Sequence, residues 1–197
     1  MMTPWTRRRF LAVTGAGALA AAAPAGAQSR VQLVISSPAD ATTMDPGRST
    51  QVLTVNYFAN LYDTLTRWDT SLKLQPGLAT AWKSVNDTTW EITLRQGVKF
   101  HDGSPLTAPD VKAVYERNLD RGKTVVTAGF ATIEAVQVTG PTGLKIVTKK
   151  PDPLMPVRMA QMGGYIYPAR YATDDGAKEL ARKPVGTGAY RFVEWVK

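Results

Sequence analysis

The 197-residue sequence contains no cysteine and only one histidine, His101. Without cysteine the chain can form no disulfide, thiolate metal site, cysteine nucleophile or lipid-modified amino-terminal cysteine. A single histidine is too few for a histidine-rich metal site and disfavours a Ser-His-Asp triad, so no metal and no cofactor are expected. The charged fraction of 20% and the hydrophobic fraction of 44% are typical of a folded protein of ordinary composition.

The positive charge of the chain is concentrated in part at its amino terminus. The formal net charge is +8, from 24 Lys and Arg against 16 Asp and Glu. Removing Arg7, Arg8 and Arg9 from that +8 leaves +5 for residues 28–197, where no run of five like charges occurs. Scattered surface Lys and Arg explain this pattern better than a stripe that follows phosphates, so no nucleic-acid partner is expected.

Residues 1–27 are predicted to be a signal peptide. The three arginines precede an apolar stretch over 10–23, whose 14 residues are too few to span a bilayer. The small residues Ala25 and Ala27 fit an A-x-A cleavage site, with cleavage after Ala27. The segment Thr6–Leu11 resembles the twin-arginine export signal, and we expect a periplasmic protein. The alternative is a basic amino terminus that precedes a buried helix by chance.

The hydrophobic patterns predict an α+β fold built from antiparallel hairpins. Helices are predicted over 51–61, from Thr107 through Leu119, and from Pro153 to about Met162. Strands are predicted from β-branched runs and period-two alternation over 31–35, 64–68, 71–74, 81–85, 89–95, 97–103, 133–138 and 144–148, and the closing stretch 184–195 is predicted to be a loop that leads into a strand. The stretch around Asp174-Asp175 is predicted to be polar and solvated.

No set of residues survives as a catalytic site. His101, Asp102 and Ser104 lie within four residues of one strand and turn, so they cannot form the relay of a triad. The glycine pair 186 and 188 neither follows a strand nor opens a helix, as a phosphate-binding loop would. We therefore expect a protein that is not an enzyme.

Several motifs, in order along the chain, resemble one family. They are Met44-Asp45-Pro46, residues 61–65, residues 78–82, the long stretch 87–111 and residues 184–192. Together they are similar to the family 5 extracytoplasmic solute-binding proteins of ABC transporters, which include oligopeptide, dipeptide, glutathione and nickel-binding receptors. Ala189 stands where the family usually has proline.

The resemblance implies a type II periplasmic-binding-protein fold with a mixed sheet. Its two lobes would be joined by a hinge and close over a ligand. By that comparison, 28–49 and 166–197 would belong to lobe one and 50–165 to an additional small α+β domain. The second lobe would be absent from this chain, which would then be the amino-terminal part of a longer receptor.

The resemblance also suggests which residues face the ligand cleft. By their position in the family pattern they are Thr50, Asn56, Tyr57, Phe130, Gly164 and Tyr165. Glycine lets a peptide backbone approach closely, and tyrosine offers a flat apolar body with one hydroxyl. The alternative for Tyr57 and Phe130 is a place in the hydrophobic core.

The resemblance further implies the substrate-binding component of an ABC importer for peptides or similar small solutes. Its partners would be the solute and an ABC permease in the membrane, and we expect a monomer. The alternatives are a non-functional truncated remnant and, less favoured, a secreted hydrolase.

Overall fold

The computed structural model describes residues 33–196. The predicted signal peptide and its cleavage site lie outside these residues. Contacts divide the chain into two units, residues 1–36 and residues 37–197. In the part of the first unit that is described, Leu33, Val34 and Ile35 form no strand and are 69–79% exposed. The prediction of a buried strand over 31–35 is therefore wrong for residues 33–35.

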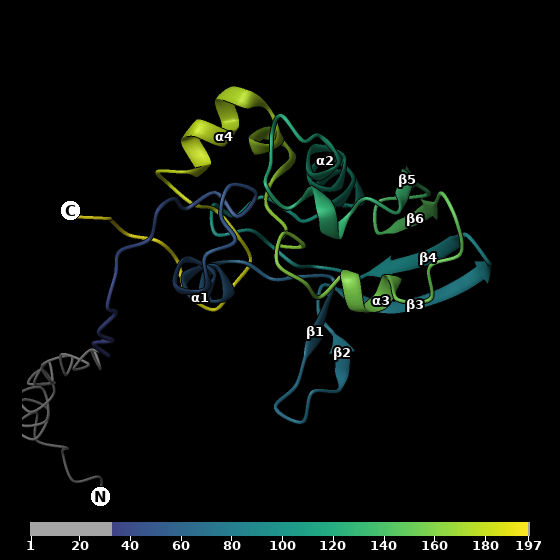
Figure 1. Ribbon diagram of the computed structural model, residues 1–197, viewed down its shortest axis with the longest axis horizontal. Helices are drawn as coiled ribbons and strands as arrows, with labels where there is room; N and C mark the ends of the chain where they lie inside the picture. The colour runs from purple at the N-terminus through teal and green to yellow at the C-terminus, as the bar shows by residue number, and fades with distance from the viewer. Residues whose placement is uncertain (1–32, 197) are drawn as a thin grey trace, which may run out of the picture. The chain divides into compact units, whose positions relative to one another are not determined.

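The second unit begins with an irregular segment and helix α1, Val52–Leu61. A two-stranded antiparallel hairpin follows, with β1 at Thr66–Trp68 and β2 at Leu74–Pro76. In Figure 1 this hairpin extends away from the other elements of the unit. The predicted helix and the predicted hairpin are both confirmed, although β2 begins and ends later than expected.

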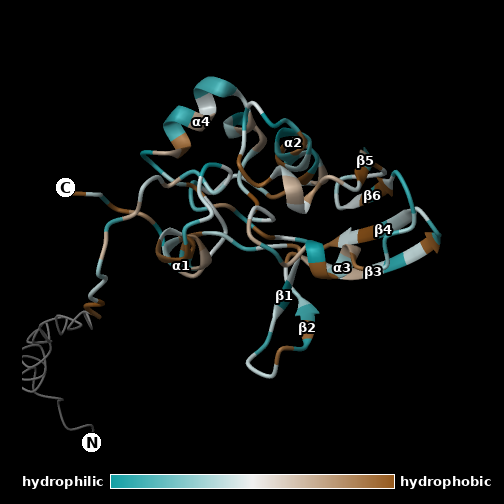
Figure 2. Ribbon diagram, in the orientation of Figure 1, coloured by the Kyte–Doolittle hydropathy of each residue, from teal (hydrophilic) through white to brown (hydrophobic). Residues whose placement is uncertain are grey.

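A four-stranded antiparallel sheet forms the largest regular part of the unit, with the order β3-β4-β6-β5. Its strands are β3 (Ala79–Asn86), β4 (Thr89–Leu94), β5 (Ile133–Val138) and β6 (Gly143–Thr148). Figure 2 shows both hydrophilic and hydrophobic residues along β3 and β4. Every strand pairing among residues 33–196 is antiparallel, so the parallel pairing of a mixed sheet is not found in this part.

Helix α2, Ala108–Leu119, packs against β5 and buries one face. Its start is set by Thr107, whose backbone N–H donates to the Asp110 carboxylate at 2.9 Å and whose hydroxyl donates to the same oxygen at 2.7 Å. The other carboxylate oxygen of Asp110 accepts from the backbone N–H of Ala169 at 2.8 Å. The cap thus fixes the helix start and also joins it to a segment 59 residues away.

The remaining helical segments are short. They are the 3-10 helices η1 (Thr127–Gly129) and η2 (Ala169–Ala172), and the helices α3 (Met155–Arg158) and α4 (Asp174–Leu180). The helix predicted over 153–162 is thus shorter than expected. Helix α4 differs from the expectation of a solvated stretch around Asp174-Asp175, because the two acids lie in its first turn, where the helix dipole favours them. Thr173 supplies the cap, its hydroxyl accepting from the N–H of Gly176.

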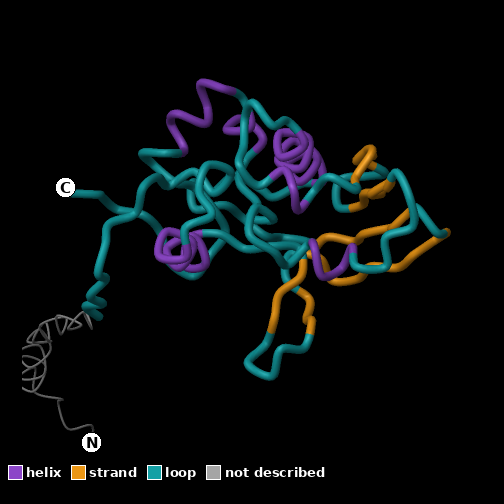
Figure 3. The backbone as a smooth tube through the Cα atoms, in the orientation of Figure 1, coloured by secondary structure: helices purple, strands orange, loops and turns teal. Residues whose placement is uncertain are grey.

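Two further strand predictions are wrong. Residues 97–103 make only one isolated bridge, between Lys99 and Pro105, because a turn closed by Gly103 at φ +87° folds the segment back on itself. Residues 190–195 run as a loop, and no described strand pairs with them. Figure 3 shows both as loop segments. A β-branched or aromatic run becomes a strand only where a partner satisfies its backbone groups.

Among the described residues, no helix combines the length and the apolar character needed to cross a membrane.

Candidate functional site

Three of the residues predicted to face a ligand lie at helix α1: Asn56 and Tyr57 are on the helix, and Thr50 lies two residues before its start. Thr50 and Asn56 are exposed, and Tyr57 is half-buried against the core. The helix begins without a side-chain cap from Gln51, but the hydroxyl of Ser49 accepts from the Gln51 N–H at 3.2 Å. The exposed side of α1 therefore carries both the apolar Val52 and the polar Asn56, while Thr54 and Phe58 are fully buried.

The segment 163–167 brings Gly164 and Tyr165 beside α1. The ring of Tyr165 lies 6.1 Å from the ring of Phe58 and 6.1 Å from the ring of Tyr62, between centroids. The backbone N–H of Ile166 donates to the carbonyl of Asp63 at 2.9 Å, which joins this segment to the chain just after the helix. Burial raises the pKa of the Tyr165 phenol, which therefore stays protonated at neutral pH.

Gly164 occupies a position where a side chain would be crowded. A Cβ atom there would lie 3.0 Å from the carbonyl oxygens of both Met159 and Gln161. The glycine before it, Gly163, has φ +89°, and a Cβ on it would come within 2.7 Å of the Val126 side chain. Both glycines are thus explained by close packing of the 163–164 backbone, and a role of Gly164 toward a ligand stays a prediction.

Phe130 lies apart from the exposed residues. It is 3% exposed, and its ring meets that of Tyr115 in a T-shaped contact at 5.0 Å. The structure therefore places this side chain in the core, while Thr50 and Asn56 point to solvent. We use the name candidate wall for the other five predicted residues, Thr50, Asn56, Tyr57, Gly164 and Tyr165.

A buried ion pair that sequence reasoning did not single out joins α2 to the segment before Thr50. Arg117 of α2 donates to both carboxylate oxygens of Asp45, at 3.0 and 2.6 Å, and the two side chains are only 2% and 1% exposed. The Nη1 of Arg117 also donates to the hydroxyl of Tyr167 at 2.7 Å. The sequence does contain a signal for this buried pair, because Arg117 lies three residues after Val114 and therefore on the apolar face of α2. A charge on such a face requires a buried partner.

The protonation states of this cluster follow from its surroundings. Burial disfavours a charged guanidinium, but the hydrogen bonds and the charge of Asp45, together with the contact to Tyr167, outweigh burial and raise the pKa of Arg117 above its ordinary value. Burial raises the pKa of Tyr167 to about 12, although the nearby guanidinium opposes that shift. Tyr167 therefore keeps its proton at neutral pH, and its oxygen remains available to accept from Arg117.

The residues that suggested a triad have other contacts. The N–H of Gly186 donates to Nδ1 of His101 at 3.3 Å, which leaves the proton on Nε2, 2.9 Å from the carbonyl of Gly188. Asp102 accepts from the hydroxyl of Ser104 at 2.6 Å and forms an ion pair with Arg170. Both nitrogens of the one histidine are thus bonded to backbone, and His101 fixes the 186–188 loop.

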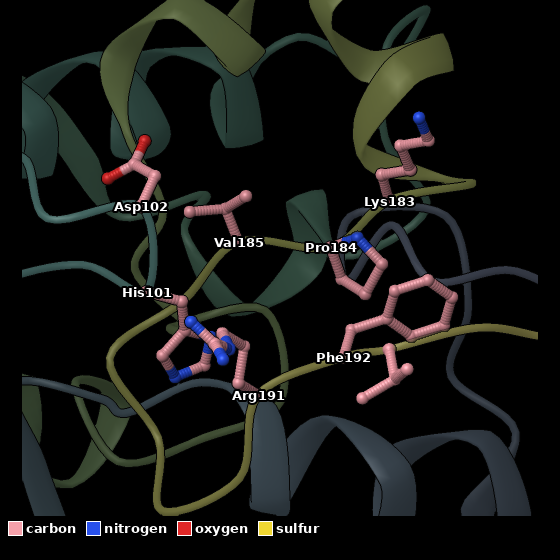
Figure 4. A pocket seen from close by; sticks show the side chains of 8 residues that line it. His101, Asp102, Lys183, Pro184, Val185, Arg191 and Phe192 are labelled. Atoms are coloured by element: carbon pink, nitrogen blue, oxygen red, sulfur yellow. The ribbon is translucent and has the colours of Figure 1, made fainter.

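Two hollows lie elsewhere on the unit, and neither is lined by the candidate wall. The first, shown in Figure 4, has a volume of about 330 Å³, and its lining residues are His101, Asp102, Lys183, Pro184, Val185, Arg191, Phe192 and Val193. The second, of about 420 Å³, is lined by Lys178, Glu179, Arg182 and Lys183. Within residues 33–196, no group of three His, Asp or Glu side chains is arranged to hold a metal ion.

A family model described as bacterial extracellular solute-binding proteins, family 5, matches residues 73–197. The chain belongs to this family. The glutathione-binding protein GsiB of Salmonella typhi is 30% identical to it over 197 residues, covering 98% of this chain and 38% of the GsiB chain. The chain thus spans well under half the length of the curated relatives it matches.

Solved structures of family 5 proteins have the same fold. The oligopeptide-binding protein AppA of Bacillus subtilis, in complex with a nonapeptide, has a TM-score of 0.74 at 27% identity, covering 82% of this chain and 33% of AppA. NikZ of Campylobacter jejuni, in complex with Ni(L-His), has a TM-score of 0.69 at 26% identity, covering 81% of this chain and 32% of NikZ. These matches confirm the expected type II periplasmic-binding-protein fold for the part of it that this chain covers.

Proposed function

We propose that this chain serves as the solute-binding component of an ABC importer for peptides or similar small solutes. Membership of family 5 supports this role, as do relatives named for binding glutathione, an oligopeptide and a nickel complex. The observation within the chain that supports the proposal is the packing of Tyr165 against Phe58 of α1 and against Tyr62 just after it, which puts the 163–165 segment next to the helix that carries Asn56 and Tyr57.

The chemistry of the candidate wall suits a small polar solute with an extended backbone. The exposed side chains of Thr50 and Asn56 offer hydroxyl and amide groups, while Tyr57 and Tyr165 offer apolar ring faces. A peptide would gain hydrogen bonds from the first pair and ring contacts from the second. In a receptor that has both lobes, a ligand that contacts both would favour the closed state, because its affinity differs between the two states.

The proposal includes the surroundings in which the protein works. We propose export by the twin-arginine route, cleavage after Ala27 and a periplasmic location, with an ABC permease in the membrane as the partner. The protein would act as a monomer. We also propose that 28–49 and 166–197 belong to one lobe, with 50–165 as the additional domain of the family.

Ligand-observed NMR on the purified 197-residue chain tests the binding function. We expect saturation transfer to glutathione or to the tripeptide Ala-Ala-Ala, since this technique detects weak, rapidly exchanging complexes. Asn56→Ala should reduce the signal by about half or more, through loss of one ligand hydrogen bond. The control Gln137→Ala, on the exposed side of β5, should leave it unchanged. Equal signals from both variants, or none from the unmodified chain with any probe, would contradict the proposal.

A further inference from the structure

The last turn of helix α2 holds the segment that leads into the candidate wall. Through its two hydrogen bonds to Asp45, Arg117 fixes the buried residues 44–47, which lie just before Thr50 and the start of α1. The same segment is held by the hydroxyl of Tyr62, which donates to the Met44 carbonyl at 2.8 Å, and by the Val125 N–H, which donates to the Gly47 carbonyl at 2.9 Å.

The same turn of α2 also holds the other half of the wall. Arg117 donates to the hydroxyl of Tyr167, two residues beyond Tyr165. Asn118, fully buried, donates through Nδ2 to the carbonyl of Gly163 at 2.7 Å, one residue before Gly164. Two adjacent residues of α2 therefore contact the segment that precedes Thr50 and the segment that carries Gly164 and Tyr165, and these segments are more than 100 residues apart in sequence.

Stability alone gives little reason for a charge pair at this place. Removing two charges from water is expensive, and apolar side chains of similar volume often stabilise a core as well as a buried ion pair does. A bidentate guanidinium–carboxylate contact instead fixes direction as well as distance, which apolar packing does not. The Arg117 contacts are thus suited to setting the relative position of the two segments.

We propose that Arg117 and Asn118 are positioning residues, which act through Asp45, Tyr167 and Gly163 to hold the two halves of the candidate wall at the spacing that a solute needs. This inference rests on the proposed solute-binding function. The two residues themselves are buried and do not touch the solute.

The first test replaces the ion pair by an apolar pair in the full chain. Arg117→Met alone leaves Asp45 buried without its partner and should lower the thermal midpoint strongly. Asp45→Leu combined with Arg117→Met should recover most of that loss, because no unpaired charge remains. The pair Lys83 and Glu91, 2.7 Å apart with side chains 69% and 33% exposed, supplies the control double variant Lys83→Met with Glu91→Leu.

Amide hydrogen exchange then reports position independently of any ligand. In the Asp45→Leu, Arg117→Met variant we expect Val125 and Ile166, which bond to Gly47 and Asp63, to exchange about tenfold faster relative to Leu94 in the sheet. The control double variant should exchange as the unmodified chain does. Unchanged exchange at both amides in a variant of recovered stability would overturn the positioning role.

Asn118→Ala provides a second variant that introduces no buried charge. It should speed exchange at Ile166 but leave Val125 unchanged, because only the bond to Gly163 is lost. Exchange at Ile166 as slow as in the unmodified chain would overturn the positioning role of Asn118. This test can be made even if the double variant does not fold.

Saturation transfer to glutathione and Ala-Ala-Ala connects position to binding. The Asp45→Leu, Arg117→Met variant should lose most of the signal although its thermal midpoint has recovered, and a full signal would overturn the inference. If the unmodified chain gives no signal with either probe, the solute-binding proposal fails, while the exchange experiment still decides whether the two residues set the position of the segments.

Discussion

Gly188 lies where the loop 186–190 crosses the carboxy-terminal end of α1. Its N–H donates to the carbonyl of Leu61 at 3.0 Å, and the N–H of Tyr190 donates to the carbonyl of Asn60 at 3.0 Å. The last carbonyls of a helix have no partner within the helix, so this loop supplies two of the missing donors. A Cβ atom on Gly188 would lie 2.5 Å from the carbonyl carbon of Leu61.

Gly188→Ala should therefore destabilise the fold. The added methyl group meets backbone that cannot move aside cheaply, and we expect the free energy of unfolding in urea to fall by about 2–4 kcal/mol. Gly140→Ala is the matched control, since a Cβ there meets nothing within 4 Å, and should change stability by less than about 0.5 kcal/mol. A loss of similar size in both variants would show that the close approach of the loop to α1 does not matter.

Asp102 makes the stability of the fold depend on pH in the acid range. Burial raises the pKa of this carboxyl, but hydrogen bonds from Ser104 and Arg170 outweigh burial and lower the pKa to about 2. A carboxyl with a pKa lower in the folded state stabilises the fold above its unfolded pKa. That contribution is lost as the pH falls through the folded value.

The expected result is a pH-dependent difference between the unmodified chain and Asp102→Asn. Above pH 5 the unmodified chain should be more stable by about 1 kcal/mol, a figure reduced for the half-exposed Arg170 partner. The difference should shrink between pH 4 and pH 2, in urea unfolding at constant ionic strength. A difference that stays constant over this range would contradict the ion pair as its source.

At the scale of elements, local signals predicted the hairpins and helices that have strong turn and cap residues. Asn86-Asp87 between β3 and β4 and Thr107 before α2 are examples in which the residues that end or start an element are specific. The runs 33–35 and 190–195 have equally good strand composition but no described strand beside them. Strand pairing depends on residues distant in sequence, which composition does not encode.

The tip of the β1–β2 hairpin holds an unusual backbone. Leu72 has φ +57° and is the one described non-glycine residue with a positive φ. Its N–H donates to the carbonyl of Asp69, whose carboxylate accepts from the N–H groups of Ser71 and Lys73 at 2.8 and 2.9 Å. The Asp69 contacts thus impose a left-handed conformation on a residue that has a Cβ.

Leu72→Gly should stabilise the protein slightly. Relief of the left-handed strain exceeds the greater unfolded-state entropy of glycine, and Leu72 is 79% exposed, so little burial is lost. We expect a gain of about 0.5 kcal/mol in urea unfolding. The neighbouring control Ser71→Gly, without a positive φ to relieve, should lose about 0.5 kcal/mol. A loss in both variants would contradict strain at Leu72.

At the scale of the whole molecule, the family and its fold could be predicted from motifs spread along the chain, and the comparisons confirm both. The candidate site could be predicted only in part. Thr50, Asn56 and Tyr165 lie on or beside α1, but Phe130 is in the core, because its packing against Tyr115 depends on how α2 lies on the sheet. The Asp45–Arg117 pair joins residues 72 positions apart, a contact no local pattern reveals.

In the proposed function a solute contacts the candidate wall, on α1 and the 163–165 segment. Protein-observed ¹⁵N NMR of the full chain, titrated with glutathione and with Ala-Ala-Ala, tests it residue by residue. We predict saturable shifts of the amides of Thr50, Asn56, Tyr57 and Tyr165, with the amides of β3 and α4 unchanged. Shifts centred on the hollow at Lys183 and Arg191, or no saturable shift at α1, would contradict the claim.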